Sequence, residues 1–195
     1  MEIIEQNKQK FLELAKNNIK RDGIDELLDY LQKSDFFTAP ASTRFHSSFE
    51  GGLCAHSLNV YERFTKLLQG EYGENWQDFL SLESATIIAL FHDLCKVDTY
   101  VTEYRNVKED GVWVQKPFYA VQDKLPYGHG EKSVYIVNGF LRLTREEAMC
   151  INWHMGEYDM RAKAGVSLSD IYYKYPHAFL IHIADNMATY LDEKI

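Results

Sequence analysis

A nearly continuous apolar run at residues 85–95, with the sequence ATIIALFHDLC, constrains the fold more than any other feature. Its apolar residues cover nearly every side of a helix, whereas a surface helix has a single apolar stripe. We therefore expect a helix buried on most sides. Residues 176–191 have the same character, so two such helices should lie at the centre of the protein.

The remaining chain predicts further helices and one hairpin. Amphipathic spacing predicts helices over residues 5–20, 24–33, 53–68 and 131–143, and Thr144 with Glu147 forms a capping-box signature for a helix through Met155. Residues 99–121 instead contain two β-rich runs separated by Asp110-Gly111, a typical hairpin turn. The expected fold is mainly α, a helical bundle with a β-hairpin insertion near residues 99–121. Residues 1–195 should form a single domain, with N-terminal helices over 1–40.

The net charge limits the kinds of partner that the chain can bind, and the cysteines indicate its redox compartment. Against 29 acidic residues the chain has 21 basic ones, a net charge of −8, which argues against binding duplex nucleic acid but permits a small anionic substrate. Cys54, Cys95 and Cys150 form no disulfide framework or metal knuckle and suit a reducing compartment. No segment approaches a membrane span or a targeting signal, so we expect a cytoplasmic protein. The oligomeric state stays open.

Several ionisable residues lie where apolar ones are expected. His92 and Asp93 interrupt the first apolar helix, Asp185 interrupts the second, and His56 and His154 lie on other apolar stretches. Burying an unpaired carboxylate costs several kcal/mol, so such a residue normally binds a cation or a metal. Any one histidine alone is more often a satisfied core residue. The set as a whole is better explained by a shared cation.

The order of these residues resembles the HD-domain superfamily, which consists mostly of metal-dependent phosphohydrolases. The segments GGLCAHSLNV, IALFHDLCKV and IHIADNMATYLDE each resemble segments of that family, and the likeness extends from about Phe45 to Leu191. The order His, His-Asp, His, His, Asp is similar to the two-metal branch, which includes cyclic-nucleotide phosphodiesterases. It also resembles the HD domain of certain bacterial exoribonucleases, whose separate nucleic-acid-binding module this chain lacks. The six positions here are His56, His92, Asp93, His129, His154 and Asp185.

The resemblance implies one or two divalent transition-metal ions. The first would be held by His56, His92, Asp93 and Asp185, and a second by His129 and His154 with Asp93 bridging. Two such ions about 3.5–4 Å apart activate water and hold a phosphoryl oxygen. Ligands rich in nitrogen suit Mn, Fe, Co, Ni or Zn, and the sequence does not choose among these metals or between one ion and two.

Further residues are candidates for catalysis and substrate binding. Lys96 follows Asp93 by three residues, so it either orients Asp93 and neutralises a substrate phosphate or is an exposed lysine at a helix end. Arg44 and His46 precede the Gly51-Gly52 turn and could face the same cavity, or belong to a solvated loop. Lys132, at an expected helix start, is a weaker candidate for anion binding. The catalytic candidates are therefore Asp93 and Lys96, and the substrate-binding candidates are Arg44, His46, Lys96 and Lys132.

The expected function is hydrolysis of a phosphate ester of a nucleotide or another small phosphorylated metabolite by metal-activated water. Monoester and diester substrates are both compatible with the sequence. Two alternatives remain open. Inositol-oxygenase-like proteins resemble the same ligand order and use two irons to activate dioxygen, and a non-catalytic regulatory module could keep the fold. The hairpin, with Arg105, Lys108 and Lys116, either forms the rim of the active-site cavity or serves packing.

Overall fold

The computed structural model describes residues 2–193. Its α-helices are α1 (Glu2–Asn18), α2 (Ile24–Lys33), α3 (Gly52–Tyr72), α4 (Leu82–Phe91), α5 (His129–Asn138), α6 (Arg145–Trp153), α7 (Met160–Lys163), α8 (Leu168–Lys174) and α9 (Pro176–Met187). The short helical turns are η1 (Trp76–Asp78), η2 (Leu94–Lys96), η3 (Gly156–Tyr158) and η4 (Ala188–Asp192). The strands are β1 (Tyr100–Glu109) and β2 (Val112–Val121). The mainly α fold with one hairpin insertion is therefore confirmed.

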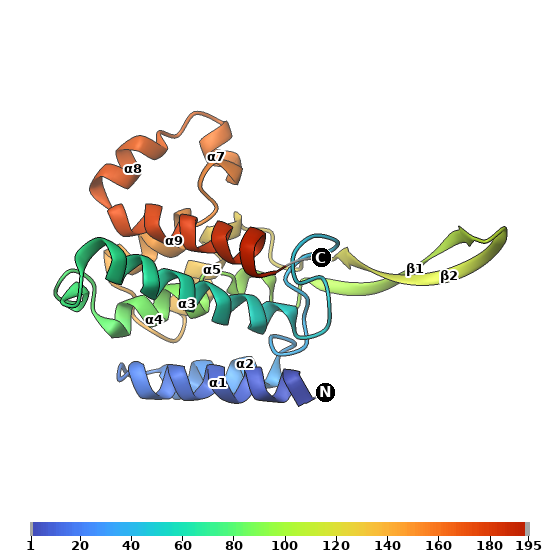
Figure 1. Cartoon of the computed structure of the whole chain (residues 1–195), viewed down its shortest axis with the longest axis horizontal. Helices are drawn as coiled ribbons and strands as arrows, with labels where there is room; N and C mark the ends of the chain where they lie inside the picture. Colours follow the sequence, from blue (N-terminus) through green and yellow to red (C-terminus); the bar gives the residue numbers. More distant parts are fainter. Residues whose placement is uncertain (1, 194–195) are drawn as a thin grey trace.

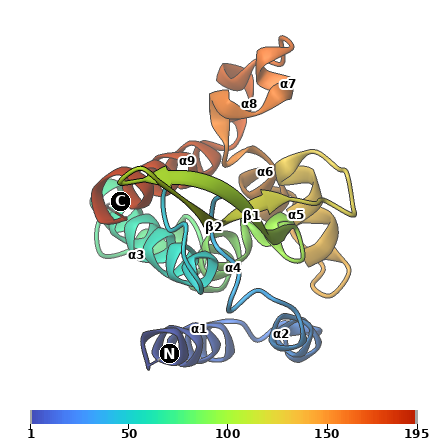
Figure 2. The same ribbon diagram turned by 90° about the vertical axis from the view of Figure 1, so that its right-hand side faces the viewer.

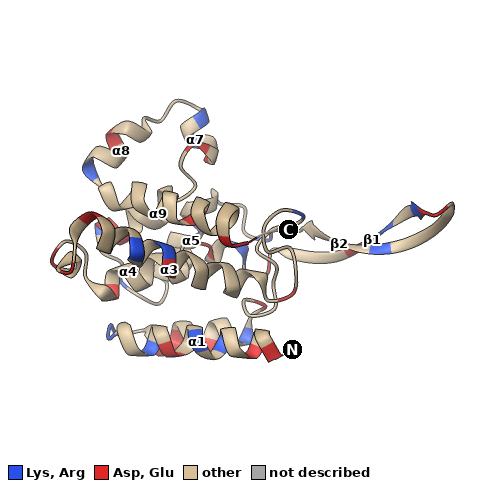
Figure 3. Cartoon of the chain, viewed as in Figure 1, with Lys and Arg blue, Asp and Glu red and all other residues tan. Residues whose placement is uncertain are grey.

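The helices are arranged in layers (Figure 1). α1 and α2 form one outer layer, α3 and α4 lie in the middle, and α9 runs along the opposite side of α3. The turned view places α5 and α6 at the side of the bundle (Figure 2). Because α4 packs against α1, α3 and α6, it is the central helix. α7 and α8 extend from the body beyond α9, and the charges along α1 are of both signs (Figure 3).

Burial follows from the apolar pattern. Every residue of α4 from Ala85 to Phe91 is buried, as expected for a helix that is apolar on all sides. One apolar cluster joins α1 and α2 to the near ends of α3 and α4, and a second lies between α3, α4 and α9. Phe11 of α1 is fully buried and packs edge-on against Phe91 at a centroid distance of 6.0 Å. The N-terminal helices thus share the core of the rest of the chain.

The central helix ends earlier than the apolar run predicts. α4 stops at Phe91, and His92 and Asp93 form a turn that leads into η2. The His92 Nδ1 atom lies 2.8 Å from the Ala89 carbonyl oxygen, and Asp93 has φ −106° and ψ 19°, which takes the backbone out of the helix. The doublet therefore lies at the end of a buried helix, where both side chains can turn toward the neighbouring helices.

Two other boundaries differ from the pattern. The fifth helix begins at His129 and ends at Asn138, whereas the apolar spacing predicts residues 131–143. The side chain of Asn138 accepts a hydrogen bond from the Leu143 backbone N–H, which closes a loop in place of a further helical turn. The expected capping box of α6 is present: Thr144 Oγ1 accepts from the Glu147 N–H at 3.2 Å, and Glu147 accepts from the Thr144 N–H at 2.7 Å.

The hairpin extends away from the helices (Figure 1). β1 and β2 pair antiparallel from Tyr100 opposite Val121 to Glu109 opposite Val112. Asp110 and Gly111 both have positive φ, 48° and 86°, as a two-residue hairpin turn of type I′ requires. Most of its residues are exposed, so only its root contacts the body. Within residues 2–193, no helix combines the length and apolarity that crossing a membrane requires.

Candidate metal centre

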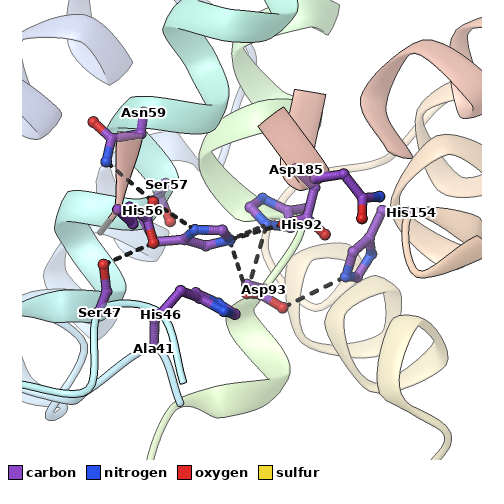
Figure 4. A network of polar contacts seen from close by, with 12 residues as sticks. Ala41, His46, Ser47, His56, Ser57, Asn59, His92, Asp93, His154 and Asp185 are labelled. Atoms are coloured by element: carbon purple, nitrogen blue, oxygen red, sulfur yellow. Dashed lines mark hydrogen bonds and ion pairs between the residues drawn. The ribbon is translucent and has the colours of Figure 1, made fainter. Parts of the chain in front are cut away.

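All six predicted ligands meet at one place inside the bundle, and Figure 4 shows five of them: His56, His92, Asp93, His154 and Asp185. They come from five parts of the chain. His56, His92, Asp93 and His154 are buried, whereas His129 and Asp185 are partly buried. The contributing elements are α3 for His56, the turn after α4 for His92 and Asp93, the first residue of α5 for His129, the residue after α6 for His154, and α9 for Asp185.

Two glycines allow these elements to approach closely. A Cβ atom on Gly52, at the start of α3, would lie 2.0 Å from the Ser47 carbonyl oxygen. A Cβ atom on Gly130, next to His129, would lie 2.1 Å from the Asn152 carbonyl oxygen of α6. Because side chains at either position would clash with backbone, glycine there brings His56 and His129 into the cluster.

Asp93 lies between two sets of histidines. Its Oδ2 atom is 3.5 Å from Nε2 of His56 and 3.5 Å from Nε2 of His92. Its Oδ1 atom is 2.9 Å from Nε2 of His129 and 3.5 Å from Nε2 of His154. Each carboxylate oxygen therefore faces its own pair of imidazoles, the arrangement in which one carboxylate can serve two cations.

Asp185 completes the first set. One of its carboxylate oxygens is 3.2 Å from Nε2 of His56, and that nitrogen is 3.3 Å from Nε2 of His92. Three groups of residues each bring their ligand atoms within 4.8 Å of one another. These groups are His56, His92 and Asp185; His92, Asp93 and His154; and Asp93, Cys95 and His129. These buried groups could hold a metal ion.

Hydrogen bonds at Nδ1 orient the histidines. Nδ1 of His92 faces the Ala89 carbonyl at 2.8 Å, and Nδ1 of His154 faces the Ile151 carbonyl at 2.7 Å. A carbonyl oxygen only accepts, so we assign the proton of each neutral ring to Nδ1. The lone pair at Nε2 then points into the cluster. Nε2 of His154 is buried and has no hydrogen-bond partner among residues 2–193, so a metal ion is a good fit for this donor set.

Glu193 provides the same support for His56. Its Oε1 atom is 2.9 Å from Nδ1 of His56 and accepts a hydrogen bond from Asn59, while Oε2 accepts one from Ser47 at 2.7 Å. A carboxylate on the outer nitrogen fixes the ring and makes it a stronger ligand.

The ionisation of this pair follows from its surroundings. Burial alone would lower the pKa of His56, but its hydrogen bonds to Asp185 and Glu193 raise the pKa to about 10. Burial raises the pKa of Glu193, and the contact with His56 more than offsets this and lowers the pKa to about 2. By contrast, burial lowers the pKa of His92 to about 3, because it outweighs the opposing effect of the Asp93 charge. His92 is therefore neutral, with the lone pair of Nε2 free to bind a metal ion.

Lys96 contacts Asp93 directly. Its Nζ atom is 2.5 Å from Oδ2 of Asp93, and its side chain is only 12% exposed. Burial raises the pKa of Asp93, but Lys96 and then His92 more than offset this and hold the pKa well below its usual range. The alternative of a freely exposed lysine at a helix end is therefore wrong.

A cavity of about 620 Å³ opens onto the cluster. Asp93, His129 and Asp185 line it, together with Lys96. Aromatic residues are prominent among its other lining side chains: Phe45, Tyr100, Tyr158 and Tyr190. The protein thus combines charged groups at the cluster with apolar rings around them.

Of the other predicted substrate-binding residues, only His46 lines the cavity. Its ring centroid is 4.9 Å from that of His56, and burial lowers its pKa to about 4. Arg44 is exposed, and its guanidinium lies over the Phe45 ring. Lys132 is buried and donates to Thr99 and Asp123 at 3.0 and 2.6 Å. Neither Arg44 nor Lys132 lies among the residues that line the cavity, which corrects the expectation for both.

The hairpin contributes to the cavity only through Tyr100 and Val121 at its root. Arg105, Lys108 and Lys116 are not among the residues that line the cavity. Lys116 pairs with Glu109, and Arg105 lies over Phe118. The expected rim is therefore limited to the first residue of β1 and the last residue of β2.

Sequence reasoning missed Glu193, Cys95 and His182. Glu193 follows Asp185 by eight residues, a little over two helical turns, and this spacing was the available signal. Cys95 lies two residues after Asp93, with its sulfur 3.3 Å from Nδ1 of His129. His182 lines the cavity, and its Nδ1 atom is 2.7 Å from the His154 carbonyl oxygen, so it helps to orient the His154 segment.

Comparison of the chain with protein-family models, with curated proteins and with solved structures finds no match. The nature of the site therefore rests on its geometry. The described residues form a helical protein with a buried His/Asp cluster that could bind metal, and this arrangement is compatible with an HD-like site.

Proposed function

We propose that this protein is a metal-dependent phosphohydrolase that cleaves a phosphate ester of a nucleotide or of another small phosphorylated metabolite. One observation carries the proposal. The two oxygens of Asp93 face separate histidine pairs, and Asp93 also lines a cavity of about 620 Å³. The order of these ligands along the chain, His, His-Asp, His, His, Asp, is that of the HD superfamily, which supports the same chemistry.

The metal supplies an activated water and a Lewis acid for the phosphoryl oxygens. His56, His92, Asp93 and Asp185 would hold one ion, and Asp93, His129 and His154 a second. The metals that suit this set are Mn, Fe, Co, Ni and Zn.

The chain's own residues have separate tasks. Asp93 would contribute one oxygen to each metal ion, and Lys96 keeps it ionised. Lys96 also lines the cavity, where it can neutralise a substrate phosphate. Lys96 is in this sense a catalytic candidate alongside Asp93. His46 is neutral, and its buried Nε2 atom in the cavity wall has no hydrogen-bond partner among residues 2–193. With the ring proton on Nε2, it is placed to donate a hydrogen bond to a substrate oxygen.

The aromatic lining favours a nucleotide within this substrate class. Phe45, Tyr158 and Tyr190 are all exposed to about half or more, although they line a cavity. Exposed aromatic rings next to a phosphate site are suited to stacking on a base, and such stacking contributes about 1–3 kcal/mol per base.

Metal analysis combined with a substrate panel tests this proposal. Purified protein should contain a transition metal and hydrolyse nucleoside phosphates or cyclic nucleotides, with activity lost on chelation and restored by one or more of the five metals. Lys96→Met should lower kcat by at least about 100-fold while metal content is kept. Two bound irons with oxygen consumption on a polyol and no phosphatase or phosphodiesterase turnover would instead establish the oxygenase alternative.

A further inference from the structure

Cys95 lies against the second half of the cluster. Its Sγ atom is 3.4 Å from Nε2 of His129 and 3.9 Å from Oδ1 of Asp93, and those two ligand atoms are 2.9 Å apart. Sulfur, nitrogen and oxygen ligands at about 2.0–2.3 Å from a tetrahedral metal lie roughly 3.3–3.7 Å from one another. The triangle of Cys95, His129 and Asp93 is within a few tenths of an ångström of that spacing.

The backbone holds this cysteine in place from both sides. The Cys95 N–H donates to Ser133 Oγ at 3.0 Å, and the Cys95 carbonyl accepts from Thr99 Oγ1 at 2.9 Å. Ser133 belongs to α5, the helix that begins at His129. The hydrogen bond to Ser133 therefore fixes the position of the thiol relative to the imidazole, as a metal site requires.

The other two cysteines have ordinary core positions. Cys54 belongs to the first apolar cluster and Cys150 to the second, whereas Cys95 belongs to neither although it is only 4% exposed. Burial raises the pKa of the Cys54 thiol to about 12. Among the described cysteines, only Cys95 has a carboxylate and an imidazole within ligand distance.

His154 supplies an independent sign of a ligand at this point. It is fully buried, and within the described part of the chain its Nε2 atom has no hydrogen-bond partner. That atom is 3.5 Å from the Asp93 oxygen that also faces His129. A buried nitrogen without a partner is costly unless something binds it.

We propose that Cys95 is a thiolate ligand of the second metal ion, beside Asp93, His129 and His154. On binding, the Sγ–H bond breaks, an Sγ–metal bond forms, and the proton passes to solvent, with no change in oxidation state. A thiolate makes this half of the centre softer than the first and selects Zn²⁺, Co²⁺ or Fe²⁺ over Mn²⁺. The inference rests on the metal centre of the proposed function but adds a ligand and a preference for metals to it.

Cobalt substitution tests the ligand directly. Full-length protein is freed of metal, kept reduced and titrated with Co²⁺, and the absorption spectrum is recorded. A thiolate on Co²⁺ gives an intense charge-transfer band in the near ultraviolet, whereas nitrogen and oxygen ligands give only weak visible bands. We expect this band in the wild type and in Cys150→Ala, the matched control, and its loss in Cys95→Ala. In Cys95→Ala, Zn²⁺ affinity at the second site should also fall by more than about tenfold.

The outcomes separate the two proposals. Visible cobalt bands without the near-ultraviolet band in wild type would overturn the thiolate ligand and leave the His/Asp centre intact. Complete absence of Co²⁺ binding would overturn both. X-ray absorption of the Zn²⁺-loaded wild type gives a second measurement, which does not depend on the folding of Cys95→Ala. A sulfur neighbour at about 2.3 Å from zinc is expected, and a shell of nitrogen and oxygen alone rejects the proposal.

Discussion

The metal-ligand cluster and the β-hairpin differ in how their geometry is held. The cluster residues are positioned by five separate parts of the chain, and contacts at the outer nitrogen orient three of the imidazoles, such as the contact of Glu193 with His56. The hairpin is held by its own ladder and turn, and most of its residues are exposed. Geometry imposed by many packed elements is sensitive to single changes, whereas a locally determined element should change without effect on the rest.

The strongest test of this contrast removes the charge at the centre of the cluster. Asp93→Asn should abolish stoichiometric metal binding, a fall of at least 100-fold in affinity, because one amide oxygen cannot replace two anionic ones. Metal content is measured by mass spectrometry of the purified protein. Asp98→Asn, a matched change at an exposed position of positive φ that asparagine tolerates, should retain full occupancy. Equal metal content in both variants would contradict the assignment of the cluster.

A change behind the cluster should have a smaller effect. Glu193→Gln removes the charge that supports His56 and should weaken metal binding about 10–100-fold, as measured by competition with a chelator. Asp192→Asn is the control, since Asp192 points to Arg63 instead. If Glu193→Gln binds metal as tightly as the control, Glu193 does not orient His56.

Removing the hairpin should leave the metal centre unchanged. The Gln122 N–H donates to the Thr99 carbonyl at 2.8 Å, so a short Gly-Ser turn can replace residues 100–121. We expect full metal content and a severalfold rise in KM, because Tyr100 and Val121 line the cavity.

A shorter deletion separates the root of the hairpin from its tip. Replacing residues 104–117 with the same turn keeps Tyr100 and Val121 in register, and its KM should equal that of the wild type. A raised KM in this variant would show that the outer part of the hairpin also meets the substrate. Metal loss in either variant would mean that the hairpin supports the cluster.

The smallest expected effect is at the hairpin tip. Gly111 has φ 86°, and no described atom lies within 4 Å of an added Cβ. Gly111→Ala should therefore lower the local stability of the hairpin by about 1 kcal/mol through backbone strain alone, and leave the stability of the bundle unchanged. Faster amide exchange should be confined to residues near the turn. The same change at Gly70, in α3 and also without neighbours, should instead stabilise the protein by about 0.5–1 kcal/mol. A loss of global stability in Gly111→Ala would show that the hairpin folds as one unit with the bundle.

The sequence predicted local features well because their causes are local. The all-round apolar pattern of α4 predicted its burial, and Asp110-Gly111 predicted the turn between β1 and β2. Asp93 and Asp185 could also be predicted as ligands, because a carboxylate in an apolar helix needs a partner.

The partners of Lys132 could not be predicted from local sequence. A lysine near a helix start suggested an anion site, but the fold brings Asp123 and Thr99 to its Nζ atom and buries it there. Partners nine and 33 residues away cannot be read from the spacing around Lys132.

By itself, then, the apolar pattern of the sequence determined that five ionisable residues, His56, His92, Asp93, His154 and Asp185, need partners in the interior. His129 became a candidate only through the resemblance to the HD superfamily. Only the tertiary structure decided how these residues are satisfied. It set Oδ2 of Asp93 toward His56 and His92 and Oδ1 toward His129 and His154, placed Glu193 behind His56, and brought Cys95 beside His129. The physical reason is that burial cost is a property of each side chain, whereas directions of approach depend on packing between helices distant in sequence.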